Sequence, residues 1–304
     1  MKVLLTGATG LLGQDVCREL HDSGLEVVAT DRNRAVDLPV PVKVADVLDY
    51  LKCYELLEGV QAVVHLAAYP NDNGGVPPQI LLNENLAMLV NLLRAAHESG
   101  VKRFIFASSV QAMAARRNDD ETGSISPSQL DYLPADGKMA ARANTHYGMS
   151  KKIGEEILAF YTREYGMHGV AIRFPHLISA RHFDYYRERY NRGGAGRTSG
   201  GRRSRRRIPN LDECFTCLST RDAGRLIAAI LERDLEGYRC YFPTAPTPSI
   251  GLPVAQLIAD YYPNVELRKP IGEMSHLVDI SKIVEETGWQ PLDDLAKTLR
   301  APKQ

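Results

Sequence analysis

Two residues that can move a proton stand four positions apart in the stretch HYGMSKK, residues 146–152. On a helix this spacing places the side chains of Tyr147 and Lys151 on one face. A free tyrosine has a pKa of about 10, and a neighbouring cation lowers that pKa toward neutrality. The pair could therefore serve as acid and base at an alcohol or a carbonyl. By itself the spacing also fits two unrelated surface side chains, so the surrounding elements have to decide.

A glycine-rich turn near the start of the chain has the form of a diphosphate cradle. The stretch TGATGLLG, residues 6–13, follows an apolar run and opens a predicted amphipathic helix over residues 11–22. Gly7 allows a tight turn, Gly10 lets the backbone approach a diphosphate, and Gly13 permits close packing of helix on strand. The start of the helix adds free N–H groups and a positive dipole. We expect cofactor contacts from Gly7, Gly10, Leu11, Leu12 and Gly13.

Acidic residues follow the next two predicted strands. Asp31 ends the second strand, where a carboxylate accepts hydrogen bonds from the adenosine ribose and repels a 2′-phosphate. This favours NAD over NADP, although Arg32, also an expected cofactor contact, and Arg34 could serve a 2′-phosphate instead. Asp46 and Val47 follow the third strand and are expected beside the adenine; a solvated acid at a turn is the alternative for Asp46.

Short apolar runs alternate with helical patterns over the first half of the chain. We expect strands over residues 3–6, 25–30, 41–45, 61–66, 103–107 and 168–174, and further helices over residues 79–98 and 150–165. Strands of this kind form a parallel sheet covered on both faces, so the fold class is α/β, a Rossmann-type doubly wound sheet. We expect a dinucleotide-binding domain over residues 1–175 and a small C-terminal substrate lobe over residues 176–304, partly interleaved with it. Within the lobe we expect a short element over residues 214–218 and helices over residues 220–232 and 252–262.

Several motifs together resemble the extended short-chain dehydrogenase/reductases, the NAD-dependent epimerase/dehydratase family. They are TGATGLLG (6–13), DV (46–47), HLAA (65–68), GVKRFIFASS (100–109), YGMSK (147–151) and RFP (173–175), with asparagines at 85 and 91 between them. Their order and spacing match the family over about residues 1–180 and continue more weakly to Trp289.

The resemblance implies a role for individual residues. Tyr147 matches the family's acid/base and Lys151 its partner, while Ser109 matches the hydroxyl that orients the reacting oxygen. A plain strand-end hydroxyl is the alternative for Ser109, and a satisfied buried amide is the alternative for Asn85. The further cofactor contacts implied are Leu66, Ala67, Ala68, Asn85, Ala107, Ser108, Phe174 and Pro175, together with Tyr147 and Lys151. The implied substrate contacts are Ser109 and His176, while His65 is expected to be a structural strand residue.

Two departures from the family pattern restrict the reaction. Val110 and Gln111 stand where the family's dehydratases carry an Asp-Glu pair, so elimination would lack its acid and base. The stretch DECFTCL, residues 212–218, has acids where epimerases carry an arginine for the substrate diphosphate. This disfavours a sugar nucleotide and leaves a sugar, a sugar acid, an amino-acid alcohol or another small hydroxylated metabolite.

We predict NAD-dependent hydride transfer at a secondary alcohol or ketone of a sugar or sugar-nucleotide-like substrate. An epimerase is slightly favoured, because that is the commonest role of these motifs in the family. The alternative is an NAD-dependent dehydrogenase or reductase of a sugar, a sugar acid or another small hydroxylated metabolite. A non-catalytic dinucleotide-binding sensor is a second alternative.

An arginine-rich segment over residues 187–207 holds nine Arg and one Glu, whereas the remaining chain has 28 basic and 36 acidic residues. Three interpretations are open: a solvated loop, a substrate loop that grips an anion through Arg202 and Arg203, and a nucleic-acid or surface contact. An acidic body with a single basic run argues against nucleic acid as a partner.

Composition limits compartment and assembly. With 304 residues, 44% hydrophobic, the chain can bury a sizeable core, and no apolar run is long enough for a membrane span. The chain start lacks a signal-peptide pattern, and the five cysteines do not suggest disulfides, so we expect a cytoplasmic protein. The pair Cys214 and Cys217 lacks a second pair for zinc, and we expect no metal site. Trp289 is expected in the core, and a homodimer through helices 79–98 and 150–165 is possible by the family resemblance.

Overall fold

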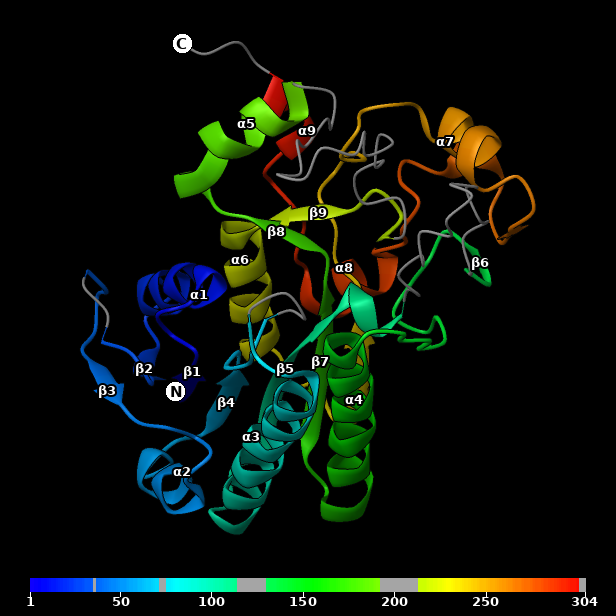
Figure 1. The fold of residues 1–304 in the computed structure, drawn as a ribbon. Coiled ribbons are helices and arrows are strands. Elements are labelled where there is room, and N and C mark those ends of the chain that lie inside the picture. The colour runs from blue at the N-terminus through cyan, green and yellow to red at the C-terminus, as the bar shows by residue number, and fades with distance from the viewer. Residues whose placement is uncertain (35–36, 71–74, 114–129, 192–212, 301–304) are drawn as a thin grey trace.

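The computed structural model describes residues 1–34, 37–70, 75–113, 130–191 and 213–300 and is built around one parallel sheet (Figure 1). Seven strands hydrogen-bond in the order β10-β7-β5-β4-β1-β2-β3, and every pairing is parallel. The strands are β1 Lys2–Thr6, β2 Glu26–Asp31, β3 Val42–Val44, β4 Ala62–His65, β5 Arg103–Ser109, β7 His168–Phe174 and β10 Tyr238–Tyr241. The chain reverses its direction of travel across the sheet between β1 and β4, and open sheets of this type bind ligands beyond the carboxyl ends of strands at that point.

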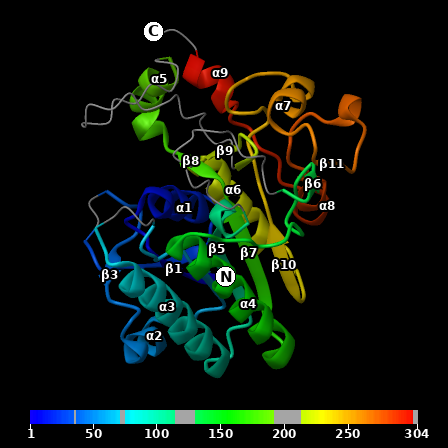
Figure 2. The ribbon, with the colours of Figure 1, turned by 45° about the vertical axis from the view of Figure 1, so that its right-hand side comes forward.

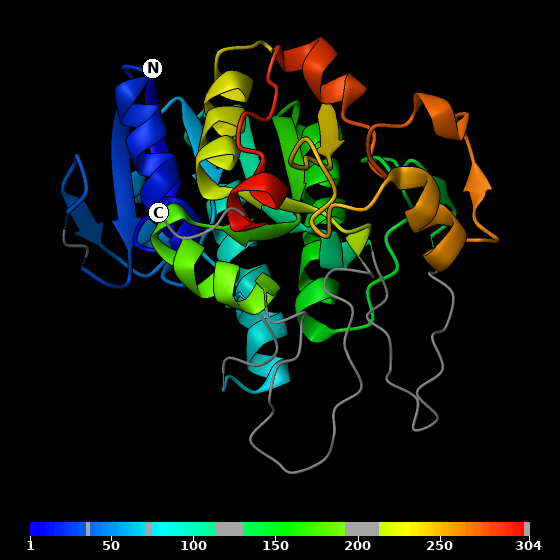
Figure 3. The same cartoon turned by 90° about the horizontal axis from the view of Figure 1, so that it is seen from above.

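Helices cover both faces of the sheet. These helices are α1 Leu11–Asp22, α2 Tyr50–Leu56, α3 Pro78–Glu98, α4 His146–Tyr165 and α6 Thr220–Leu231. Neighbouring residues of β1 point to opposite faces, so Val3 and Leu5 pack in the core beneath α1 and α6. Leu4 packs in the other core, beneath α2, α3 and α4. Figure 3, seen from above, shows the blue α1 and yellow α6 on one side of the sheet and the cyan α3 and green α4 on the other.

The chain after Pro175 builds smaller elements and also completes the sheet. It contributes β10 and α6, while β8 His176–Ile178 pairs with β9 Cys217–Ser219 and β6 Tyr132–Leu133 pairs with β11 Glu266–Leu267. The remaining elements are η1 Val110–Ala112, η2 Ala180–His182, α5 Phe183–Asn191, α7 Val254–Tyr261, η4 Ile271–Glu273, α8 Ser281–Thr287 and α9 Leu295–Arg300. A separate apolar core joins α7 to the β6 region, and Figure 2 shows these elements beside the main sheet. The division of the chain into domains at residue 175 stays a prediction.

Three features of the sheet and its helices differ from the expected elements. Helix α2 and strand β10 were not expected, because both are short and neither carries a long apolar run. Helix α4 begins at His146 rather than at residue 150, because Thr145 caps it by accepting a hydrogen bond from the Gly148 amide. This earlier start places Tyr147 in the first turn of the helix. In the described residues, no helix is long and apolar enough to cross a membrane.

Candidate functional site

A cavity of about 600 Å³ opens at the carboxyl ends of β1, β2, β4, β5 and β7. It is lined by almost all of the residues expected to bind cofactor or substrate. These are Gly7, Gly10, Leu11, Leu12, Gly13, Asp31, Arg32, Asp46, Val47, Leu66, Ala67, Ala68, Ala107, Ser108, Ser109, Tyr147, Lys151, Phe174, Pro175 and His176. The structure therefore brings together in one place side chains that are spread over most of the first 180 residues.

The glycine-rich turn forms a cradle that larger residues would fill. Gly7 has a φ of +72°, and a Cβ atom on it would lie 2.7 Å from the Ala67 nitrogen. A Cβ on Gly13 would lie 2.0 Å from the Gly7 carbonyl oxygen. Gly10 occupies the N-cap of α1 without a side-chain hydrogen bond, so the first amides of the helix remain available to an anion. These features fit the diphosphate of a dinucleotide.

The carboxylate of Asp31 is fixed at the end of β2 by two backbone amides. One oxygen accepts a hydrogen bond from the Thr9 nitrogen and the other from the Asn33 nitrogen, each at 3.1 Å. The carboxylate thus lies beside the glycine-rich turn, where an adenosine ribose would follow the diphosphate. Asp46 accepts a hydrogen bond from the Leu48 amide at 2.9 Å, so this side chain shapes its own turn while also lining the cavity. The arrangement fits NAD.

Lys151 is buried on the inner face of α4, one turn after Tyr147. Its ammonium donates to the Ala107 carbonyl oxygen at 2.7 Å and lies 5.6 Å from the centre of the Tyr147 ring. Burial lowers the pKa of Lys151 to about 7, and the negative charge of Glu155 opposes this shift. The tyrosine and the lysine therefore form one group at the cavity wall, which supports their interpretation as an acid/base pair.

The two serines at the end of β5 have different environments. Ser109 Oγ accepts a hydrogen bond from the Gln111 amide at 3.1 Å, which leaves the hydroxyl hydrogen for another acceptor. Ser108 donates its hydroxyl to Glu155 at 2.5 Å and is committed to the interior. Ser109 is therefore the better placed of the two to orient a substrate oxygen.

A buried ion pair that the motifs did not predict supports this wall of the cavity. Arg173 on β7 donates to both carboxylate oxygens of Glu155 on α4, at 2.9 and 2.8 Å. Arg173 also donates to the Met139 carbonyl oxygen at 2.6 Å. Glu155 follows Lys151 by four residues, so the same helical face carries Tyr147, Lys151 and Glu155. That spacing was visible in the sequence, but the partner on β7 was not.

Asn85 and His65 lie behind the cavity wall. Asn85 accepts from the Tyr69 amide at 2.8 Å and donates to the Tyr69 carbonyl at 3.2 Å and to Ser150 Oγ at 3.3 Å. These bonds match the alternative of a satisfied buried amide, and a direct cofactor contact by Asn85 stays a prediction. His65 Nδ1 lies 2.8 Å from the Thr6 hydroxyl, and burial lowers its pKa to about 3, as for a structural residue.

The cavity is also lined by His176, the expected substrate contact, and by Tyr186, Gln111 and Glu213. His176 and Tyr186 pack edge to face, with ring centres 5.3 Å apart. Glu213 belongs to the acidic stretch at residues 212–218, so a carboxylate from this stretch lines the cavity. Arg202 and Arg203 lie outside the described residues, as do residues 192–207 of the arginine-rich segment.

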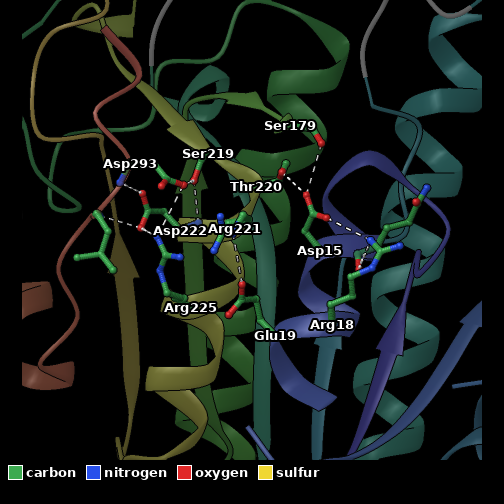
Figure 4. A network of polar contacts seen from close by, with 12 residues as sticks. Asp15, Arg18, Glu19, Ser179, Ser219, Thr220, Arg221, Asp222, Arg225 and Asp293 are labelled. Atoms are coloured by element: carbon green, nitrogen blue, oxygen red, sulfur yellow. Dashed lines mark hydrogen bonds and ion pairs between the residues drawn. The ribbon is translucent and has the colours of Figure 1, made fainter. Parts of the chain in front are cut away.

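Polar contacts tie the cradle helix α1 to the chain that follows β7 (Figure 4). Asp15 on α1 accepts a hydrogen bond from Thr220 of α6 and lies 3.5 Å from the Ser179 hydroxyl. Asp222, also on α6, accepts from the Asp293 amide at 2.9 Å. The network therefore joins α1 to the segment after β8 and to α6, and joins α6 to the chain near Asp293.

The cysteines and the tryptophan are not among the residues that line the cavity. The five cysteines are free, and Cys214 and Cys217 are buried, Cys217 on β9 and Cys214 in the preceding turn. Over the parts of the chain that the structure describes, no cluster of His, Cys, Asp or Glu could hold a metal ion. Trp289 is buried in the core beneath α1 and α6 and donates to the Asp222 carbonyl oxygen.

Comparison with known proteins places this site in a family. The fold and the cavity define a dinucleotide-binding protein with a tyrosine–lysine pair at its wall. Residues 3–234 match the model of the NAD dependent epimerase/dehydratase family, and the chain belongs to that family. The predicted family, the Rossmann-type fold, the enzyme class and the use of NAD are thereby confirmed.

Two curated relatives illustrate the range of similar sequences. The NAD-dependent glucose-6-phosphate dehydrogenase of Haloferax volcanii is 29% identical over 241 residues, 77% of this chain and 81% of that protein. The uronate dehydrogenase of Pseudomonas putida is 31% identical over 176 residues, 57% of this chain and 59% of that protein. The match to the second thus spans less than two thirds of its length.

Solved structures share the fold at low identity. A UDP-glucose 4-epimerase of Thermotoga maritima with UDP-glucose has a TM-score of 0.68 at 19% identity, over 99% of this chain and 96% of that one. A Thermus thermophilus UDP-glucose 4-epimerase in complex with NAD has a TM-score of 0.68 at 21% identity, over 99% and 97%. A partial consensus L-threonine 3-dehydrogenase has a TM-score of 0.69 at 21% identity, over 98% and 97%.

Proposed function

We propose that this protein is an NAD-dependent dehydrogenase that oxidises a secondary alcohol of a small sugar or sugar derivative. The observation that carries the proposal is the position of Tyr147 and the buried Lys151 at the wall of a cavity that fits a dinucleotide. Curated relatives named as dehydrogenases of glucose 6-phosphate and of uronate support the choice of substrate class.

Bound NAD would supply the acceptor for the hydride that leaves the substrate carbon. Tyr147 would take the proton of the substrate hydroxyl as the C–O bond gains double-bond character. Protonated Lys151 would stabilise the tyrosinate, since a nearby positive charge lowers the pKa of a phenol. Ser109 would donate its hydroxyl hydrogen to the same substrate oxygen, because its own oxygen already accepts from the Gln111 amide.

An epimerase is the second candidate, because the family model that matches residues 3–234 is named for epimerases and the same three side chains serve that reaction. The two differ in whether the hydride returns to the substrate. Protein denatured after purification would release stoichiometric NAD if the cofactor is recycled in place, which favours the epimerase. We expect substoichiometric nucleotide and reversible binding of added NAD, as for a dehydrogenase. Release of NADP would contradict the role given to Asp31.

Three further properties complete the proposal. The arginine-rich segment would hold an anionic group of the substrate through Arg202 and Arg203, because guanidinium groups make paired bonds to phosphate and carboxylate. The protein would form a homodimer through α3 and α4, whose outer surface exposes Val90, Phe160 and Tyr165. It would reside in the cytoplasm, consistent with five free cysteines.

A further inference from the structure

A series of hydrogen bonds links Arg32 to Tyr69 and Glu84, next to the place in the cavity where the adenosine ribose is expected. The Arg32 guanidinium donates to the Tyr69 hydroxyl at 3.1 Å and lies 5.0 Å from the centre of the Tyr69 ring. The same hydroxyl donates to Glu84 on α3 at 2.7 Å. Tyr69 thus uses its oxygen to accept from the arginine and its hydrogen to reach the carboxylate.

The backbone of Tyr69 is held in place by the residue next to Glu84. Asn85 binds both the amide and the carbonyl of Tyr69, and its own side chain is buried. The ring and hydroxyl of Tyr69 therefore project from a fixed point toward Arg32. The electrostatic surroundings agree: the hydrogen bond to Tyr69 raises the pKa of Arg32, and the charges of Asp46 and Glu84 act in the same direction.

Arg32 directly follows Asp31, whose carboxylate is fixed beside the cradle. An arginine at this position is a ready partner for the 2′-phosphate of NADP, provided that its guanidinium can leave its present contacts. In the structure the Arg32 guanidinium instead donates a hydrogen bond to the Tyr69 hydroxyl, and that hydroxyl donates to the Glu84 carboxylate. Asp31, Asp46 and Glu84 then give this end of the cavity a negative field.

We propose that Tyr69 and Glu84 determine the choice of NAD over NADP by withholding Arg32 from a 2′-phosphate. The inference rests on the function proposed for this cavity and adds two specificity-determining residues to it. Neither residue would touch the reacting atoms. Their effect would be on the ratio of the dissociation constants for NAD and NADP. They would act by fixing the position of the Arg32 guanidinium and by reducing its availability to a 2′-phosphate.

Calorimetric titration with NAD and with NADP tests this without any substrate. Tyr69→Phe keeps the ring and removes the hydroxyl, and Glu84→Gln removes the charge behind it. We expect each to tighten NADP binding by about tenfold, the equivalent of one gained charge-assisted hydrogen bond, and to change NAD binding by less than about twofold. In the Tyr69→Phe background, Arg32→Ala should abolish the gain, whereas in the wild type it should leave NADP binding nearly unchanged.

A matched control exists on the outer surface. Tyr54 donates to Glu98, which also accepts from Arg94 at 3.0 Å, so the same three residue types meet away from the cavity. Tyr54→Phe should leave both dissociation constants as in the wild type. If Tyr69→Phe still binds NAD but binds NADP no more tightly than the wild type does, the inference about Tyr69 and Glu84 is wrong and the proposed function is unaffected. A wild-type protein that binds neither nucleotide would instead overturn the proposed function.

Discussion

At the scale of single residues, Lys151 is the side chain whose environment is most informative. It is 4% exposed, donates to a main-chain carbonyl and has Glu155 as its nearby negative charge. Burying a protonated lysine in this way costs free energy of desolvation, a cost that is absent for an exposed lysine. Such a cost is expected where a charge is needed for chemistry, because perturbed pKa values concentrate at functional sites.

This cost makes the stability of the protein depend on pH in a defined direction. The pKa of Lys151 in the folded protein is about 7, below its value in the unfolded chain. Below pH 7 the folded protein therefore contains a buried, protonated Lys151, which lowers its free energy of unfolding. As the pH rises above 7, Lys151 loses its proton in the folded state and this destabilisation decreases. Lys151→Met lacks the penalty, so it should be more stable than the wild type at pH 6.5. That advantage should shrink by about 2 kcal/mol on going to pH 9.

Urea unfolding of both proteins at the two pH values provides the measurement. The difference in free energy of unfolding between the variant and the wild type cancels the titration of all other groups. A difference that stays constant from pH 6.5 to pH 9 would mean that Lys151 does not release its proton in this range.

The glycines and Asp31 were expected together from their positions at the ends of predicted strands, whereas the grouping of Ser109 with Tyr147 and Lys151 came from the family resemblance. All of these residues line one cavity, and their roles stay predictions. The contacts that depend on long-range pairing could not be predicted. Tyr69 and Glu84 carry no motif, and their relation to Arg32 arises only because the fold brings a residue after β4 and a residue of α3 to the residue that follows β2.

At the scale of elements, the wall that carries Tyr147 and Lys151 is supported by one buried ion pair. Glu155 and Arg173 are both at most 7% exposed in their side chains, and they join α4 to β7. Removing one partner leaves the other charge buried without compensation, which is strongly destabilising. We expect Glu155→Gln to lower the free energy of unfolding by about 3 kcal/mol.

The chain offers an adjacent control for this prediction. Glu156 pairs with Lys152 at 3.0 Å on the solvent side of the same helix, with 65% of its side chain exposed. Glu156→Gln should cost at most about 0.5 kcal/mol, because exposed pairs contribute little. Equal urea midpoints for the two variants would show that the buried pair does not hold α4 on the sheet.

Elements with a strong apolar signal were predicted well, and those that depend on tertiary pairing were not. Strands β1 and β7 and helices α1 and α3 agree closely with the expected ranges, since each combines a long apolar pattern with clear ends. Strand β10 is four residues long and only partly buried, so its place at the edge of the sheet follows from its partner β7.

At the scale of the whole molecule, the outer surface of α3 and α4 is the best candidate for assembly. The rings of Phe160, Tyr161, Tyr165 and His97 contact one another there, and Phe160 and Tyr165 are 42% and 45% exposed. Aromatic side chains that gather on an exposed surface are typical of protein interfaces.

We therefore expect the wild type to sediment as a dimer and the double variant Phe160→Glu, Tyr165→Glu to sediment as a monomer. Charges placed at the centre of an apolar interface oppose association, because they must lose water without gaining a partner. Leu292→Glu serves as the control, since Leu292 is 69% exposed and its amide donates to Asp222 on α6. Sedimentation velocity of the wild type as a monomer at all concentrations would contradict the proposed dimer.

The most direct test of the proposed activity is the rate of NADH formation by wild type and Tyr147→Phe. Both proteins would be given NAD and a panel of sugars, sugar acids and sugar phosphates. We predict that a member of the panel is oxidised by the wild type and that Tyr147→Phe lowers kcat by at least about a hundredfold, the usual contribution of a general base. The dissociation constant for NAD should change little. Oxidation of the same substrate by Tyr147→Phe at the wild-type rate would contradict the role of this tyrosine and the account of the site.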